Sequence, residues 1–121
     1  MVVRNVIDHV NEVKPNAFSD ARLMDFLNEI ESMVWEEVLD EDPTEYRQLV
    51  LPDDYETELT APAPYSKIYT SYIQAMIDYQ NEESVAYQND MSMFNSVYLD
   101  FKKYMQRTNA ADNWHRFRNI W

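Results

Sequence analysis

The chain has 121 residues and a hydrophobic share of 45%, which fits one globular domain with a buried core. Its formal net charge of −12 disfavours nonspecific attraction to DNA, to RNA or to an anionic membrane. Glycine and cysteine are absent, so the sequence predicts an all-α protein inside a cell, without glycine-rich phosphate loops, tight β-hairpins, disulfides or thiolate zinc sites.

The first forty residues predict two amphipathic helices. Apolar residues recur at helical spacing over residues 3–13, and a proline shortly afterwards ends this first helix. Ser19 is a good N-cap for the second helix, which is expected to run to about Leu39. Phe18 and Leu23 occupy the two positions of a hydrophobic staple around that cap.

Residues 40–64 interrupt the helical pattern because four prolines fall within them. A connection of this length is uncommon in a small domain and tends to be functional. The region is also acidic, since ten Asp or Glu residues lie between residues 36 and 58 against Arg47 alone. Within it, the apolar residues 49–51 form either a short strand or an anchor that pins the loop to the body.

Residues 65–105 predict a long two-helix hairpin. Two ladders of aromatic and methionine residues follow steps of three and four, which place their members on one face of a helix. The ladders are Tyr65, Tyr69, Tyr72, Met76 and Tyr79, and then Tyr87, Met91, Phe94, Tyr98, Phe101 and Met105. A polar break at residues 80–84 separates them, so the two ladders are expected to face each other. Pro64 is expected at the first position of the first helix. Further apolar stripes must meet the helix at residues 20–39 or another subunit.

Residues 106–121 are predicted to form a docking arm that follows a helical domain of residues 1–105. The polar stretch 108–113 resembles a flexible spacer, and the last eight residues alternate aromatic and basic groups. Trp and Arg are strongly enriched in binding hot spots, which favours docking to a protein partner over a free end. The residues expected to dock are Trp114, Arg116, Phe117, Arg118 and Trp121.

Histidine and carboxylate pairs do not add up to a metal centre. His9 and Glu12 lie three residues apart, as do Asp112 and His115. A carboxylate-bridged metal centre in a helical bundle needs several such pairs on facing helices. Ordinary polar surface is therefore the favoured interpretation of both pairs.

The acidic group Glu36, Glu37 and Asp40 is the strongest candidate for catalysis, because all-α nucleotide pyrophosphatases bind magnesium through similar carboxylates. Such enzymes need a further Glu-x-x-Glu motif on a neighbouring helix, and the sequence has none. A nucleophile elbow and a phosphate-cradling loop are absent as well. The sequence thus predicts no catalytic residue, no cofactor and no metal ion.

Residues 15–105 resemble the small head–tail connector (adaptor) proteins of long-tailed bacteriophages, of the helical type that sits under the portal ring. The motifs are structural rather than catalytic. They are Pro15-Asn16-Ala17-Phe18, Leu27-Asn28-Glu29-Ile30-Glu31, the proline-rich acidic loop, Pro64-Tyr65-Ser66-Lys67-Ile68-Tyr69 and Ala75-Met76-Ile77-Asp78-Tyr79.

The resemblance implies a subunit that forms a ring, commonly of twelve copies, on the portal protein at the head–tail interface of the virion. It implies assembly in the host bacterial cytoplasm, contact with a tail or stopper protein, and genomic DNA that passes through the lumen without specific binding. No membrane contact is implied. By location, the arm corresponds to the segment that such proteins dock into the portal. The candidates for a DNA-repelling lumen surface are Asp53, Asp54, Glu56 and Glu58.

Two other functions stay open at this stage. An acidic helical protein could imitate the phosphate spacing of DNA and inhibit a nuclease or another DNA-binding protein, acting as a monomer or dimer. Alternatively, the acidic group at Glu36 and Glu37 could support metal-dependent nucleotide hydrolysis. Loss of hydrolysis on substitution of those two residues would support the second alternative.

Overall fold

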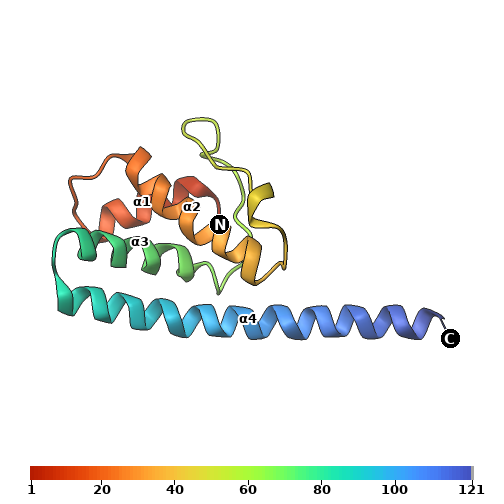
Figure 1. Ribbon diagram of the computed structural model, residues 1–121. Helices are drawn as coiled ribbons and strands as arrows, with labels where there is room; N and C mark the ends of the chain where they lie inside the picture. The colour runs from red at the N-terminus through yellow and green to blue at the C-terminus, as the bar shows by residue number, and fades with distance from the viewer. Residues whose placement is uncertain (121) are drawn as a thin grey trace.

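The computed structural model describes the backbone of residues 1–120 and the side chains of residues 1–108. Its elements are α1 (Val3–Val13), α2 (Asp20–Glu37), the short 3₁₀ helix η1 (Pro43–Glu45), α3 (Lys67–Gln80) and α4 (Ser84–Ile120). Helix α3 is central, with α4 along one side and α1 and α2 on the other (Figure 1). No strand occurs in the described backbone, which has one isolated bridge between Val2 and Glu58. The predicted all-α fold is confirmed.

The N-terminal helices follow the local sequence signals closely. Helix α1 begins and ends within the predicted range 3–13. Ser19 caps α2, because its hydroxyl accepts a hydrogen bond from the Arg22 backbone N–H at 3.2 Å. Phe18 packs edge-on against Phe26, with ring centroids 6.1 Å apart, and the predicted staple partner Leu23 is buried in the same core. Helix α2 ends at Glu37, shortly before the predicted Leu39.

The two ladders pack against each other between α3 and α4, as predicted. Three ring pairs mark the seam from its base to its tip, with centroids 5.8, 5.4 and 5.7 Å apart: Tyr65–Phe101, Tyr72–Phe94 and Tyr79–Tyr87. Ile73 and Ile77 form a second stripe on α3 and are buried as well. Helices α1 and α2 cover that side of α3, so the chain itself, rather than another subunit, encloses this stripe.

Helix α4 is longer than the sequence analysis predicted. Its backbone is helical to Ile120, so the predicted spacer at residues 108–113 lies inside a helix. The physical reason is that residues 106–120 contain neither proline nor glycine, the two residues that stop helices most strongly. At 1.5 Å per residue, α4 is about 55 Å long and α3 about 21 Å. The last part of α4 therefore projects beyond the body (Figure 1).

Two turns next to the helices contain non-glycine residues with positive φ angles. Asp40 after α2 and Glu82 between α3 and α4 take positive φ angles of 55° and 59°, although glycine adopts this conformation most easily. Helix α3 begins at Lys67, three residues after Pro64. The proline therefore lies in the turn before the helix rather than at its first position, which corrects that prediction.

Buried polar contacts attach the α2–α3 connection to the body. The Asn28 side chain on α2 donates to the Leu49 carbonyl and accepts from the Leu49 N–H, both at 2.9 Å. The Tyr46 hydroxyl donates to the same Asn28 oxygen at 2.8 Å. Leu49 is buried, and its neighbour Val50 is half exposed. Residues 49–51 are thus an anchor rather than a strand.

A second contact joins the loop to two helices at once. Tyr69 on α3 donates its hydroxyl hydrogen to Glu31 of α2 at 2.9 Å, and the same oxygen accepts the Ala61 N–H at 2.9 Å. The other Glu31 oxygen accepts the Thr60 N–H at 3.0 Å. Burial raises the pKa of Glu31 against the opposing effect of these hydrogen bonds. The network fixes the end of the loop to the centre of the bundle.

Candidate interaction surfaces

The predicted docking arm coincides with the projecting end of α4. Met105 packs against the core, and the Thr108 hydroxyl donates to the Tyr104 carbonyl at 3.0 Å. Residues 106–120 then continue for about 22 Å of helix, away from the rest of the described chain (Figure 1). The predicted docking side chains Trp114, Arg116, Phe117 and Arg118 lie outside the described side chains, and Trp121 lies outside the described residues.

The body part of α4 packs along α3 and also reaches α2, where Tyr98 and Lys102 meet Glu37, whereas the arm continues past these elements (Figure 1). An isolated helix of about 15 residues is marginal in water, since packing of one face normally supplies most of the stability of a helix. A projecting segment of this kind is a natural place for a protein partner to bind.

The four acidic loop residues predicted to line a lumen differ in their surroundings. Asp53 is exposed, whereas Asp54 is 5% exposed and is unavailable as a surface charge. Glu56 is paired with the Arg4 side chain, and Glu58 lies 2.7 Å from the amino group of Met1. The prediction therefore fails for Asp54.

Asp54 instead organises the loop around itself. Its carboxylate accepts hydrogen bonds from the Val50 N–H at 2.7 Å, from the Thr57 hydroxyl at 2.8 Å and from both terminal nitrogens of Arg47, at 3.0 and 3.3 Å. The Arg47 guanidinium, followed by these other donors, lowers the pKa of Asp54 to about 2. The burial of Asp54, which the sequence pattern does not indicate, therefore stabilises the loop.

We expect Asp54→Asn to lower the thermal midpoint of unfolding (Tm) at pH 7. Asp54 has a depressed pKa in the folded state, so its contribution is present above the ordinary Asp pKa of about 3.9. That contribution is lost as the pH falls through about 2. The Tm difference between the variant and the parent protein should therefore close between pH 4 and pH 2, which calorimetry can follow.

Asp53→Asn is the matched control, because Asp53 is the exposed neighbour on the same turn. Its Tm should equal that of the parent protein throughout the same pH range. A Tm difference for Asp54→Asn that stays constant down to pH 2 would mean that the ionised carboxylate is not the stabilising group.

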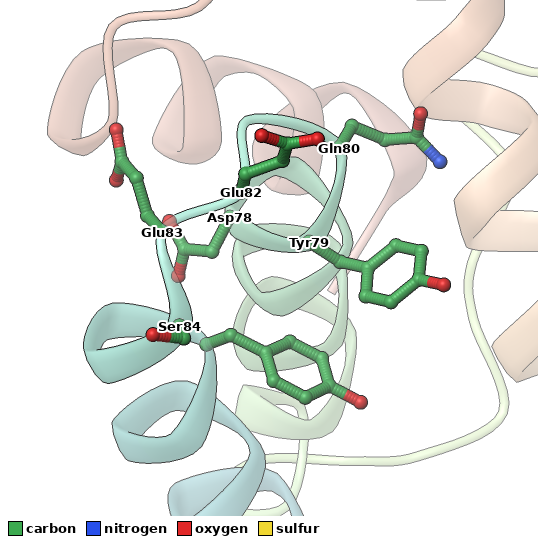
Figure 2. A pocket seen from close by; sticks show the side chains of 7 residues that line it. Asp78, Tyr79, Gln80, Glu82, Glu83 and Ser84 are labelled. Atoms are coloured by element: carbon green, nitrogen blue, oxygen red, sulfur yellow. The ribbon is translucent and has the colours of Figure 1, made fainter.

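The turn between α3 and α4 carries a concave surface of about 580 Å³. We call it the tip pocket; its lining residues are Asp78, Tyr79, Gln80, Glu82, Glu83, Ser84 and Tyr87. Figure 2 shows the carboxyl groups of Asp78 and Glu83 on one side of the turn and the Tyr79 ring on the other. Tyr79 is 63% exposed although it belongs to the first ladder. The pocket therefore combines negative charge with an accessible aromatic surface.

A partly buried charge cluster adjoins this pocket through Asp78, which is its fully buried member. The Lys14 ammonium at the end of α1 bonds the Asp78 carboxylate of α3 and lies 2.9 Å from Asp90 of α4. Asp78 is 0% exposed, and its Oδ2 atom has no hydrogen-bond partner among the described groups. Burial, and then the neighbouring Asp90 carboxyl, raise the pKa of Asp78 to about 6. One lysine thus holds together three helices that are far apart in sequence.

The sequence analysis did not find this cluster or the pocket. The available signal was Asp78 itself, a charged residue beside the buried Ile77 in an otherwise apolar part of α3. A buried carboxylate needs a partner. No local pattern, however, points from Asp78 to a lysine 64 residues earlier in the chain.

The acidic group proposed for metal binding is not assembled into a site. Glu37 accepts a hydrogen bond from the Tyr98 hydroxyl at 2.6 Å and lies 3.7 Å from the Lys102 ammonium. Glu36 and Asp40 are exposed. Among the side chains of residues 1–108, no group of three or more His, Asp or Glu residues is placed to hold a metal ion.

Comparison with known proteins finds no matching family model, no curated relative and no solved structure of similar fold. The resemblance to phage connector proteins therefore stays a prediction from the sequence motifs. Among the described helices, none is both long enough and apolar enough to cross a lipid bilayer.

Proposed function

We propose that this protein is a structural subunit of a long-tailed bacteriophage: a head–tail adaptor that forms a ring on the portal and links the DNA-filled head to the tail. Its activity in this proposal is assembly rather than catalysis. The resemblance of residues 15–105 to such adaptors motivates the proposal, and one structural observation carries it. That observation is the projecting end of α4, a helical arm that leaves a well-packed body.

The body is suited to serve as a fixed platform for such an arm. Ring pairs run along the whole α3–α4 seam, and the Lys14 cluster and the Glu31–Tyr69 contact tie that hairpin to α1, α2 and the loop. A rigid base reduces the conformational entropy that is lost when the arm binds a partner. The arm itself brings three aromatic and two basic residues, in its last eight positions, to a partner surface.

The acidic surface suits a channel through which DNA must slide. Asp53, Glu56 and Glu58 are the exposed members of the four predicted lumen residues, and the net charge of −12 repels DNA at close range. In this proposal the chain meets the genome without binding it, while the portal on one side and a tail or stopper protein on the other provide the specific contacts.

Removal of residues 109–121 should abolish capture of the protein by the portal ring of the same phage. Loss of even one hot-spot side chain costs about 2 kcal/mol or more, which corresponds to a weakening of about 30-fold. Surface plasmon resonance on immobilised portal rings measures this effect. The truncated chain keeps every described side-chain contact of the body, so its circular dichroism Tm should match that of the full chain.

The substitution Trp114→Ala in the full chain tests whether portal binding depends on the side chains of the arm rather than on its length alone. It should weaken portal capture while the helical content stays unchanged. Undiminished portal affinity after removal of residues 109–121 would refute the docking role of the arm.

A further inference from the structure

The tip pocket has the chemistry of a site for a guanidinium group. We propose that it binds the basic C-terminal arm of a second copy of this chain before the portal takes that arm, a contact that rests on the proposed docking role of the arm and assigns a surface by which free copies meet. The pocket volume of about 580 Å³ falls in the range of sites that enclose a small ligand or a few side chains.

The groups around the pocket match what an arginine needs. Glu82 and Glu83 are exposed carboxylates, and the Tyr79 ring packs against Tyr87 at 5.7 Å while most of its own surface stays accessible. A planar guanidinium stacks on such rings and donates up to five hydrogen bonds to nearby carboxylates. Asp78 also lines the pocket, but its Oδ2 atom is buried and its carboxylate already bonds Lys14, so it adds local negative charge and no acceptor at the surface.

The chain itself contains the complementary segment. Residues 107–121 hold Arg107, Arg116 and Arg118 against Asp112, so their net charge is +2. The remaining residues then carry −14, because the whole chain carries −12. Aromatic residues adjoin the arginines of the arm and suit the rings of Tyr79 and Tyr87. Charge and aromatic character are thus matched between arm and pocket.

The positions of the two surfaces exclude a contact within one molecule. The tip pocket lies where α4 begins at Ser84, whereas the arm is the opposite end of the same helix, about 55 Å away (Figure 1). A contact between them therefore joins different copies head to tail. Such a heterologous contact closes into a ring or continues as a filament, and it does not stop at a symmetric pair.

Two charge reversals test the contact in full-length protein. Glu82→Lys/Glu83→Lys gives a copy whose tip and arm are both basic, and Arg116→Glu/Arg118→Glu gives a copy whose tip and arm are both acidic. Sedimentation equilibrium at about 0.01 M salt, where the screening length is about 30 Å, should show the parent protein above its 14.5 kDa monomer mass. Each variant alone should associate at least about tenfold more weakly.

An equimolar mixture of the two variants should associate again, because each tip then meets an arm of opposite charge. Glu41→Lys/Glu45→Lys is the matched control: these exposed acids lie on the loop and η1, and their reversal changes the net charge equally. That control should associate as the parent protein does. In 1 M salt, where the screening length is about 3 Å, association of the parent protein should weaken.

Portal capture is measured separately on the same proteins. Glu82→Lys/Glu83→Lys should retain it, since the arm is intact, so a failed contact between copies and a failed portal contact are told apart. A parent protein that stays monomeric at all concentrations would overturn the assignment, as would a mixture that fails to associate. Loss of portal capture in the tip variant would also overturn it, because the portal would then be the occupant of the pocket.

Discussion

Replacement of Lys14 by methionine should lower the free energy of unfolding by about 3 kcal/mol, because loss of one partner leaves an uncompensated buried charge. Lys14 is the bonded cation between Asp78, which is fully buried, and Asp90. Methionine keeps much of the apolar stem, so the change isolates the charge from the packing. Urea denaturation at pH 7 measures the loss as a shift in the midpoint without a change in slope.

The double variant Lys14→Met/Asp78→Asn is the control, since the neutral amide no longer needs a cation. It should recover most of the stability that Lys14→Met loses. The loss should also shrink as the pH falls from 7 to 5, because the raised pKa of Asp78 means that the folded state favours its protonated form. Equal losses in the single and double variants would show that Lys14 acts through packing.

Tyr69→Phe should lower the free energy of unfolding by about 3 kcal/mol. Removal of the hydroxyl leaves two buried groups unsatisfied, and each unsatisfied group costs about 1–3 kcal/mol. One Glu31 oxygen loses its donor, although the other keeps the Thr60 N–H, and the Ala61 N–H loses its acceptor. The ring itself still fills its place in the core, where Tyr69 is 0% exposed. The end of the α2–α3 loop should also exchange its amide hydrogens faster, which hydrogen-exchange mass spectrometry can locate.

Tyr72→Phe is the matched control on the same helix. Its hydroxyl donates to Glu29 at 2.8 Å in an exposed setting, where water replaces the lost partner. We expect a change within about 0.5 kcal/mol, the usual range for surface substitutions. If both substitutions lower the free energy of unfolding equally, then burial does not determine how much the Tyr69–Glu31 hydrogen bond contributes to stability.

Local patterns were sufficient to predict the helices and their seam. The spacing from Tyr65 to Met105 placed two ladders face to face, and the Ser19 cap fixed the start of α2 within one residue. The end of α4 differs from the prediction because the polar composition of residues 108–113 indicates a spacer, while the absence of proline and glycine there lets the helix continue.

The candidate surfaces were less accessible to sequence analysis. The arm was found from its composition, because Trp and Arg together in a short segment are a local signal. The tip pocket required the fold, since it forms only when Asp78 and Glu83 from the two sides of a turn are placed around it. The burial of Asp54 depends on hydrogen bonds from Arg47 and Val50, which come close to it only when the loop is folded. No local sequence pattern indicates that arrangement, so the sequence predicts Asp54 at the surface.

The central position of α3 has a consequence for how copies come together. Its two long flanks are already occupied by α4 and by α1 with α2, so an incoming molecule has no access to the hydrophobic interior. In the proposed assembly, each copy therefore folds without help from its neighbours, and joining other copies is a separate, later event. Substitutions at the periphery can therefore tune the order and strength of recruitment without altering the heat resistance of the single molecule.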